Sequence, residues 1–333
     1  MQRETGLWQD VSELPSSLAA TLDARDGVDD VAAVVGSDRV RRVVASGNGA
    51  AYYVAVALWL ASLESSEGPE VVAVPSGLLA RGAFAWREGD LFLAVSSSGE
   101  FRDLVEAVDA GVPTPFAAVT ADAGSTLGSR ADARALVTVE HQRAVTHTQA
   151  FCGAVAAGLA VWAEVTSDAA LGEGLRSLPE GLESIVARAG AWADQIGDVP
   201  AETAVVFGSG PGWAAALEAA LLLKEVAGIP AEGVETREGA TSAMMALRPG
   251  TLALSLPAGA GDPLLAEAEE ICAGQGATVL QAPGGEGVDR LLAAITTFPA
   301  AAALSMRIGL ERGLDVDRPA WTDAYYRVAR GTT

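Results

Sequence analysis

Two stretches of the sequence match each other at a constant offset of 161 residues, and this repeat constrains the fold more than any other feature. Near residue 43 the chain reads VVASGNGAAYYVAVALWLASL, and near residue 205 it reads VVFGSGPGWAAALEAALLLKEV. In each stretch, a short β-branched run leads through a pair of glycines into a long apolar segment of helical pattern. Gly47 corresponds to Gly208, and further along Gly89 corresponds to Gly250 at the same offset. The shared offset predicts an internal duplication of a whole domain.

Short apolar runs alternate with helical segments within each copy. The runs are VVAVPSG, LFLAVSS, PFAAVTA and ALVTVE in the first copy, and TAVVFGSG, LALSLPA and ATVLQAP in the second. Continuous apolar strands separated by helices indicate a parallel sheet that is covered on both faces. We therefore predict an α/β protein with two doubly wound parallel sheets flanked by helices, each a flavodoxin-like three-layer sandwich.

These patterns divide the 333 residues into five parts. We expect an N-terminal arm (1–35) with a helix from Leu14 to about Asp26, a first domain (36–165), a helical connector (166–198), a second domain (199–318) and a C-terminal tail (319–333).

The composition excludes several classes of protein. The formal net charge is −21, so the basic footprint of a nucleic-acid-binding protein is missing. The N-terminus does not resemble a signal peptide, and the longest apolar runs are shorter than the roughly 20 residues of a membrane span. We therefore expect a soluble, cytoplasmic protein with neither nucleic acid nor membrane as a partner. Cys152 and Cys272 lie in apolar segments and are expected to be buried thiols, and no metal or organic cofactor is expected.

The run LFLAVSSSGEFRD ends a predicted strand on three serines, where α/β sheets bind ligands. Ser96, Ser97 and Ser98 offer hydroxyls, and Gly99 permits a close turn. A helix from about Glu100 would add free amides and the positive end of its dipole, so we expect a phosphate site.

A serine is also a common helix cap, which is the simpler explanation for this loop. The second copy, however, reads PAGAG at 257–261 and has no hydroxyl there. If the serines served only as caps, both copies would need them. We therefore expect one working pocket and one scaffold copy.

Five stretches together resemble the sugar isomerase (SIS) family, and the resemblance spans nearly the whole chain. The serine loop is similar to the family's Ser-Gln-Ser-Gly-Glu-Thr, and ALEAALLLKEVAGIPAEG is similar to Ala-Leu-Glu-Gly-Ala-Leu-Lys-Leu-Lys-Glu. The other three are ETGLWQDVSELPSSL, RAVTHTQAF and GLDVDRPAW. The tandem arrangement resembles the isomerase half of glucosamine-6-phosphate synthase and free-standing phosphosugar isomerases, deaminases and deglycases. No glutaminase domain and no N-terminal catalytic cysteine is visible, so glutamine-driven amination is not expected.

The resemblance implies aldose–ketose isomerisation of a sugar phosphate through an enediol, for which a carboxylate base is needed. It places that base at Glu225. The residues that it implies for holding the sugar phosphate are Gly47, Asn48, Gly49, Ser96, Ser97, Ser98, Gly99, Arg102, Val145, Thr146, Thr148, Thr241 and Arg327.

The chain also departs from the family pattern. The position of the family's ring-opening histidine falls on Thr241, and that of a C-terminal lysine falls on Ala324, near Arg327. We therefore expect His147 or Glu238 to supply the ring-opening acid and base. Glu218 is expected to be structural.

Three functions stay open at this point. The first is a phosphosugar isomerase, and the second is an amino-sugar phosphate deaminase or deglycase. The third is a phosphosugar-binding or regulatory protein without catalysis, which the missing histidine and lysine favour. Phe101 and Arg102 in the anion loop also leave room for a sulfonate or carboxylate sugar. We expect a homodimer, because the apolar segment AAYYVAVALWLASL needs a large cover.

Overall fold

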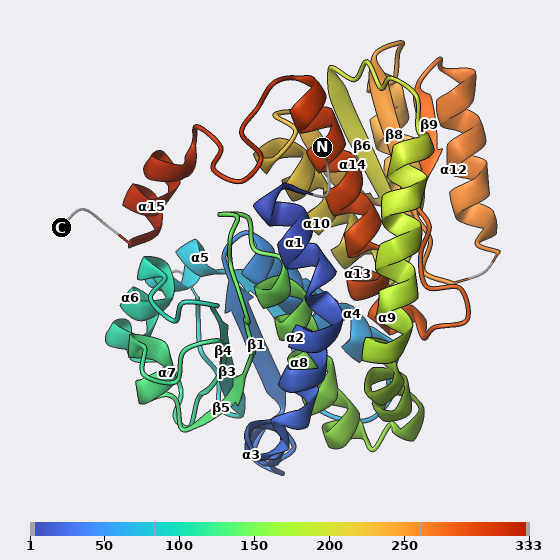
Figure 1. Ribbon diagram of the computed structural model, residues 1–333. Helices are drawn as coiled ribbons and strands as arrows, with labels where there is room; N and C mark the ends of the chain where they lie inside the picture. Colours follow the sequence, from blue (N-terminus) through green and yellow to red (C-terminus); the bar gives the residue numbers. More distant parts are fainter. Residues whose placement is uncertain (1–3, 83, 260, 331–333) are drawn as a thin grey trace. The chain divides into compact units, whose positions relative to one another are not determined.

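The computed structural model describes residues 4–82, 84–259 and 261–330, and it contains two parallel β-sheets flanked by helices (Figure 1). The chain divides into two compact units that interleave along the sequence. The five-stranded unit comprises Ser16–Glu140, Gln149–Arg176 and the chain from Ala320 onward. The four-stranded unit comprises the chain up to Pro15, His141–Thr148 and Ser177–Pro319. The domain boundaries expected from the sequence remain a prediction.

The five-stranded sheet has the strand order β2-β1-β3-β4-β5. Its strands are β1 (Arg42–Gly47), β2 (Glu70–Pro75), β3 (Asp90–Val95), β4 (Ala117–Thr120) and β5 (Ala133–Leu136). The helices are α2 (Leu14–Asp23), α3 (Arg25–Val35), α4 (Ala50–Leu63), α5 (Ser76–Ala80), α6 (Arg102–Gly111), α7 (Thr126–Arg130), α8 (Gln149–Thr166) and α15 (Thr322–Arg330).

The four-stranded sheet has the order β7-β6-β8-β9. Its strands are β6 (Thr203–Gly208), β7 (Ala231–Glu235), β8 (Thr251–Leu256) and β9 (Thr278–Gln281). The helices are α1 (Gly6–Ser12), α10 (Gly212–Glu225), α11 (Thr236–Ser242), α12 (Pro263–Gly274), α13 (Ala293–Thr296) and α14 (Phe298–Glu311), with 3₁₀ turns η2 (Ala243–Ala246) and η3 (Arg290–Leu292). The long helix α9 (Ala169–Gln195) begins in one unit and continues in the other.

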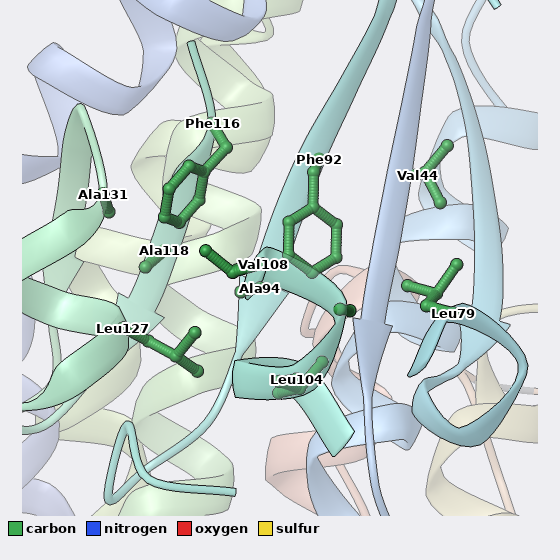
Figure 2. Packing of buried hydrophobic residues seen from close by; sticks show 11 residues of the cluster. Val44, Leu79, Phe92, Ala94, Leu104, Val108, Phe116, Ala118, Leu127 and Ala131 are labelled. Atoms are coloured by element: carbon green, nitrogen blue, oxygen red, sulfur yellow. The ribbon is translucent and has the colours of Figure 1, made fainter. Parts of the chain in front are cut away.

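A cluster of apolar side chains packs helices onto the five-stranded sheet (Figure 2). The rings of Phe92, on β3, and Phe116, just before β4, lie with their centroids 6.1 Å apart. Helix α6 contributes Leu104, Ala107 and Val108, whose spacing of three and four residues gives the helix one apolar face. This packing fixes the helix that follows the serine loop.

The offset found in the sequence reappears in the backbone. Strands β1 and β6, β3 and β8, and β4 and β9 have bounds that all differ by 161. Gly89 and Gly250 adopt φ values of 85° and 90°, which favour glycine. The carbonyl of Gly89 accepts hydrogen bonds from two successive amides at the start of β1, and the carbonyl of Gly250 does the same at the start of β6. The register of the pairs β1–β2 and β6–β7 differs by one residue. Glu70 faces Arg42, whereas Ala231, which lies 161 residues after Glu70, faces Ala204 and not Thr203.

Several elements differ from those predicted. The strand expected at ALVTVE lies earlier, at β5, and β7 was not predicted because AEGVE is rich in glutamate and glycine. The helix expected to reach about Asp26 ends at Asp23.

Two helical segments are long and apolar enough to cross a membrane, contrary to the estimate from the sequence runs. They are Gln149–Thr166 and Arg290–Glu311, and 83% and 89% of their apolar windows are buried inside the protein. This burial is typical of core helices.

Candidate active site

Helix α10 carries two glutamates on an otherwise apolar sequence, GWAAALEAALLLKE. Glu218 lies in the middle of the helix and is 2% exposed, whereas Glu225 is the last helical residue and is partly exposed. Beyond the helix, Gly228 has a φ of 63°, and the amide of Ile229 donates to the carbonyl of Leu223. This left-handed turn closes the helix end that holds Glu225.

The surroundings of Glu225 suit proton transfer at neutral pH. Burial raises the pKa of Glu225 to about 7, although the Thr146 hydroxyl and the charge of Lys224 act in the opposite direction. Thr146 is 2% exposed, and its hydroxyl makes no hydrogen bond of standard geometry within the described part of the chain. A carboxyl group with a pKa near 7 exists in both protonation states and can therefore take up and return a proton.

Glu218 is in a different state. Burial, and then repulsion from Glu225, raise the pKa of Glu218 well above its usual value, with Lys224 opposing. Its Oε2 atom is buried without a hydrogen-bond partner among the described residues. Leu222 stands where the family pattern has a lysine, so the helix offers no cation one turn away. The raised pKa favours the protonated form of Glu218 in the core, which fits a structural role.

The segment His141–Thr148 belongs to the same unit and brings the next candidates. Thr146 and Thr148 are buried, and the amide of Val145 donates to the carbonyl of Asp317 at 2.9 Å. Burial lowers the pKa of His147, and its Nδ1 atom has no hydrogen-bond partner within the described residues. His147 is therefore a neutral imidazole, one residue from the group that acts on Glu225.

Glu238 and Thr241 both lie on the short helix α11 and are exposed. The amide of Glu238 donates to the carboxylate of Glu235 at 3.0 Å, and the Thr241 hydroxyl donates to the carbonyl of Arg237. Glu235 is the N-cap of this helix, which the sequence analysis did not predict. A carboxylate three residues before Glu238 is the sequence signal that could have indicated it.

The serine loop lies in the five-stranded unit, between β3 and α6. The hydroxyl of Ser96 accepts from the amide of Gly99 at 3.1 Å, and that of Ser98 accepts from the amide of Glu100 at 3.3 Å. The carbonyl of Ser97 accepts from the amide of Ala121. Two of the three hydroxyls therefore hold the loop itself.

Gly99 is required by this geometry. Its φ is 63°, and a Cβ atom there would lie 1.9 Å from Oγ of Ser125. The helix begins at Arg102, two residues later than expected, and Phe101 caps it without a side-chain hydrogen bond. The carboxylate of Glu100 instead accepts from the amide and hydroxyl of Thr126. The first turn of α6 thus keeps amides without a side-chain cap, as anion loops do.

Three further residues predicted to bind phosphate lie at this edge of the same sheet. Strand β1 pairs with β3, so the carboxyl ends of both strands reach one edge, and Gly47, Asn48 and Gly49 follow β1. Gly49 caps α4 with a φ of 54° and without a side-chain hydrogen bond.

Arg102 and Arg327 are exposed arginines of the same unit. The guanidinium of Arg102 lies 3.6 Å from the carboxylate of Glu106. Arg327 lies on α15, which packs against α6.

The four-stranded unit has a cavity of about 450 Å³ at the corresponding ends of β8 and β9. Trp192, Asp262 and Glu286 are among its lining residues, and none of the described residues that line it is a serine or threonine. A carboxylate-bearing pocket without hydroxyls disfavours phosphate. The asymmetry expected between the two copies remains a prediction.

The architecture, two parallel α/β sheets flanked by helices, is that of phosphosugar isomerases. The C-terminal domain of glucosamine-fructose-6-phosphate aminotransferase from Francisella tularensis is similar at a TM-score of 0.80, with 19% identity, over 95% of this chain and 98% of that one. Tagatose-6-phosphate ketose/aldose isomerase from Escherichia coli gives 0.77, with 19% identity over 94% and 95%. Glucosamine-6-phosphate deaminase from Thermotoga maritima gives 0.75, with 20% identity over 95% and 98%.

The sequence comparison agrees with the fold. The chain is 29% identical over 213 residues to human glutamine–fructose-6-phosphate aminotransferase (isomerizing) 2, which is 59% of this chain and 30% of the length of that relative. No family model matches the chain. The relative and the structural neighbours together confirm the resemblance to the sugar isomerase (SIS) family.

Proposed function

We propose that this chain is a phosphosugar aldose–ketose isomerase in which Glu225 moves a proton between adjacent sugar carbons. One observation carries the proposal: Glu225 ends a buried helix in surroundings that raise its pKa to about 7. Structural carboxylates on protein surfaces rarely have such a pKa, whereas catalytic acids and bases often do.

The transfer between the two carbons needs one proton carrier. The Glu225 carboxylate would take the proton from the carbon next to the carbonyl, and the electron pair of that C–H bond would form the C=C bond of an enediolate, with the negative charge on the former carbonyl oxygen. The same carboxyl group would then return the proton to the former carbonyl carbon, while the hydroxyl proton moves between the two oxygens. No atom is gained or lost, so this step requires no cofactor.

We assign phosphate recognition to the serine loop, because its backbone turns at Gly99 and α6 begins without a side-chain cap. With a net charge of −21, the chain can hold an anion only where local amides outweigh the general field. Ring opening is assigned to His147, whose Nδ1 atom is buried and unpaired within the described residues. Glu238 is the second candidate for that step.

Two alternatives follow from particular observations. A deaminase of amino-sugar phosphates would use the same base, and a glucosamine-6-phosphate deaminase is among the structural neighbours. A binding protein without catalysis is favoured by the exposed Thr241 at the position of the family's histidine.

We also propose that the two sheets descend from one duplicated, doubly wound domain, with copies at 36–165 and 199–318. The shared offset of three strand pairs and the equivalent left-handed Gly89 and Gly250 support this. A homodimer is proposed as well, since Leu63 on α4 remains 65% exposed. Light scattering on the purified chain tests that proposal.

Proton exchange in heavy water tests the function. The protein is incubated with a panel of hexose, pentose and amino-sugar phosphates, and the mass of each sugar is followed. Deuterium in one sugar, with conversion to its ketose or aldose partner, supports the isomerase, whereas release of ammonia supports the deaminase. Binding of a sugar phosphate without exchange, by protein whose circular dichroism shows a folded chain, contradicts catalysis.

A further inference from the structure

The segment that carries Thr146 and His147 has no helix or strand of its own, and the buried carboxylate of Asp10 holds part of its backbone. The amides of Arg143 and Ala144 donate to one carboxylate oxygen of Asp10 at 2.8 and 3.0 Å. Asp10 lies on α1 and is fully buried. A carboxylate that accepts two successive amides fixes the direction of the chain at that point.

The other carboxylate oxygen of Asp10 accepts from the guanidinium of Arg143 at 2.9 Å. The same guanidinium donates to both oxygens of Glu13, at 2.8 and 2.7 Å. Arg143 therefore neutralises the buried charge of Asp10 and in addition pairs with the more exposed Glu13. The hydrogen bond from Arg143 lowers the pKa of Glu13 to about 2, and a contact with His141 adds to this against the opposing effect of burial.

Asp317, which lies much later in the sequence, also binds this segment. Its carbonyl accepts from the amide of Val145, and its carboxylate accepts from the amides of Gly6 and Leu7 at 2.9 and 2.8 Å. A carboxylate at the first turn of α1 is also favoured by the helix dipole. Helix α1, the segment around Val145 and the turn at Asp317 thus form one hydrogen-bonded unit.

The approach of α1 to this segment is close. A Cβ atom at Gly6 would lie 2.8 Å from Cβ of Arg143 and 3.3 Å from the carboxylate of Asp317. Helix α1 and the segment are therefore in tight contact. A displacement of α1 would move the residues that follow Arg143.

We propose that Asp10 is a positioning residue: through the amides of Arg143 and Ala144 it fixes the segment so that the Thr146 hydroxyl stays at the Glu225 carboxylate and His147 stays buried. The inference rests on the proposed function of Glu225. It explains why three of the motifs that resemble the sugar isomerase family lie far apart in the sequence. ETGLWQDV, RAVTHTQAF and GLDVDRPAW supply the three parts of this hydrogen-bonded unit.

The alternative is that Asp10 only stabilises the fold. The two roles differ in their effect on Glu225, whose titratable neighbours in this unit include Lys224 and Glu218. A purely structural loss lowers the amount of folded protein and leaves the titration of Glu225 in the folded fraction unchanged. Loss of positioning removes the Thr146 hydroxyl from the carboxylate, and the midpoint of titration rises.

The test compares Asp10→Asn with Glu13→Gln, because both residues pair with Arg143 but only Asp10 binds the segment's amides. An asparagine presents an NH₂ group to at least one of the donors. We expect the exchange rate of Asp10→Asn to fall at least tenfold and its pH midpoint to rise, whereas Glu13→Gln stays within twofold. If Asp10→Asn does not fold, Gly6→Ala displaces Arg143 more gently and should shift the midpoint in the same direction.

A folded Asp10→Asn protein with an unchanged midpoint overturns the inference. If the wild-type protein exchanges no sugar proton, the proposed function has failed. The midpoint is then read from the ¹³C resonance of the Glu225 carboxyl group, so that the positioning role is still decided.

Discussion

The end of helix α10 and the serine loop differ in the chemistry that their residues can support. At Glu225 the protein places an ionisable group in surroundings that move its pKa close to neutrality. At Ser96–Gly99 it arranges hydroxyls, a left-handed glycine and helix amides, and the carboxylate of Glu100 binds Thr126 at the start of α7. The first region suits moving a proton, and the second suits holding an anion that does not react. Under the proposed function, catalysis and phosphate recognition depend on different residues, so mutations should separate them.

The largest effect is expected for Glu225→Gln. Removing the base should lower the exchange rate about 10²–10⁴-fold, because a positioned acid or base contributes that much. Binding of the sugar phosphate, measured by calorimetry, should stay within a few-fold of the wild type. Loss of binding along with exchange would show that the two regions are not separable.

Gly99→Ala tests the serine loop. The new methyl group meets Ser125 and the φ of 63° disfavours it, so we expect about 2–4 kcal/mol less stability and weakened binding of sugar phosphates. Gly82→Ala is the matched control, because Gly82 has a φ of 62° and nothing within 4 Å of a Cβ atom. Urea unfolding measures both. Equal losses in the two variants would mean that the contact with Ser125 costs nothing.

Glu218→Met should stabilise the protein by about 1–3 kcal/mol at pH 8, since it removes a buried polar atom without a partner. The raised pKa of Glu218 makes the wild type lose stability as the pH rises above the unfolded value of 4.5. The gain should therefore shrink toward pH 4.5, which thermal unfolding at both pH values checks. A variant less stable than the wild type at pH 8 would show that Glu218 is paired in solution.

Thr146→Val should give the smallest effect. The hydroxyl lowers the pKa of Glu225, so its loss should move the pH midpoint of exchange upward by roughly half to one unit. Thr148→Val is the control for the pH midpoint, since Thr148 lies in the same segment and is also buried. A pH-rate profile of each variant measures the shift, and a shift in the control alone would be contrary to our account.

The sequence predicted the fold well because the periodic signals are local. Apolar strand runs and the glycine pairs occur in order along the chain, and the offset of Gly47 and Gly89 carries over to the second sheet. The exceptions were weak strands: β7 reads AEGVE, and its place depends on pairing with β6 rather than on its own residues.

The candidate site was predicted less completely. Glu225 stood out as a carboxylate on an apolar helix, but Asp10 in GLWQDV did not, although it too lies among apolar neighbours. Its role depends on Arg143 and Ala144, which are more than 130 residues away in the sequence. One sequence does not reveal such pairings, because nothing local marks the partner.

The most direct test of the account is the titration of Glu225 itself. Protein labelled with ¹³C at the glutamate carboxyl groups is titrated by NMR between pH 4 and 9, and Glu225→Gln assigns the resonance. The account predicts a midpoint near pH 7 in the wild type. A midpoint near 4.5, the ordinary value for glutamate, would mean that Glu225 is always ionised at neutral pH and would contradict its role as the carrier that takes up and returns the proton.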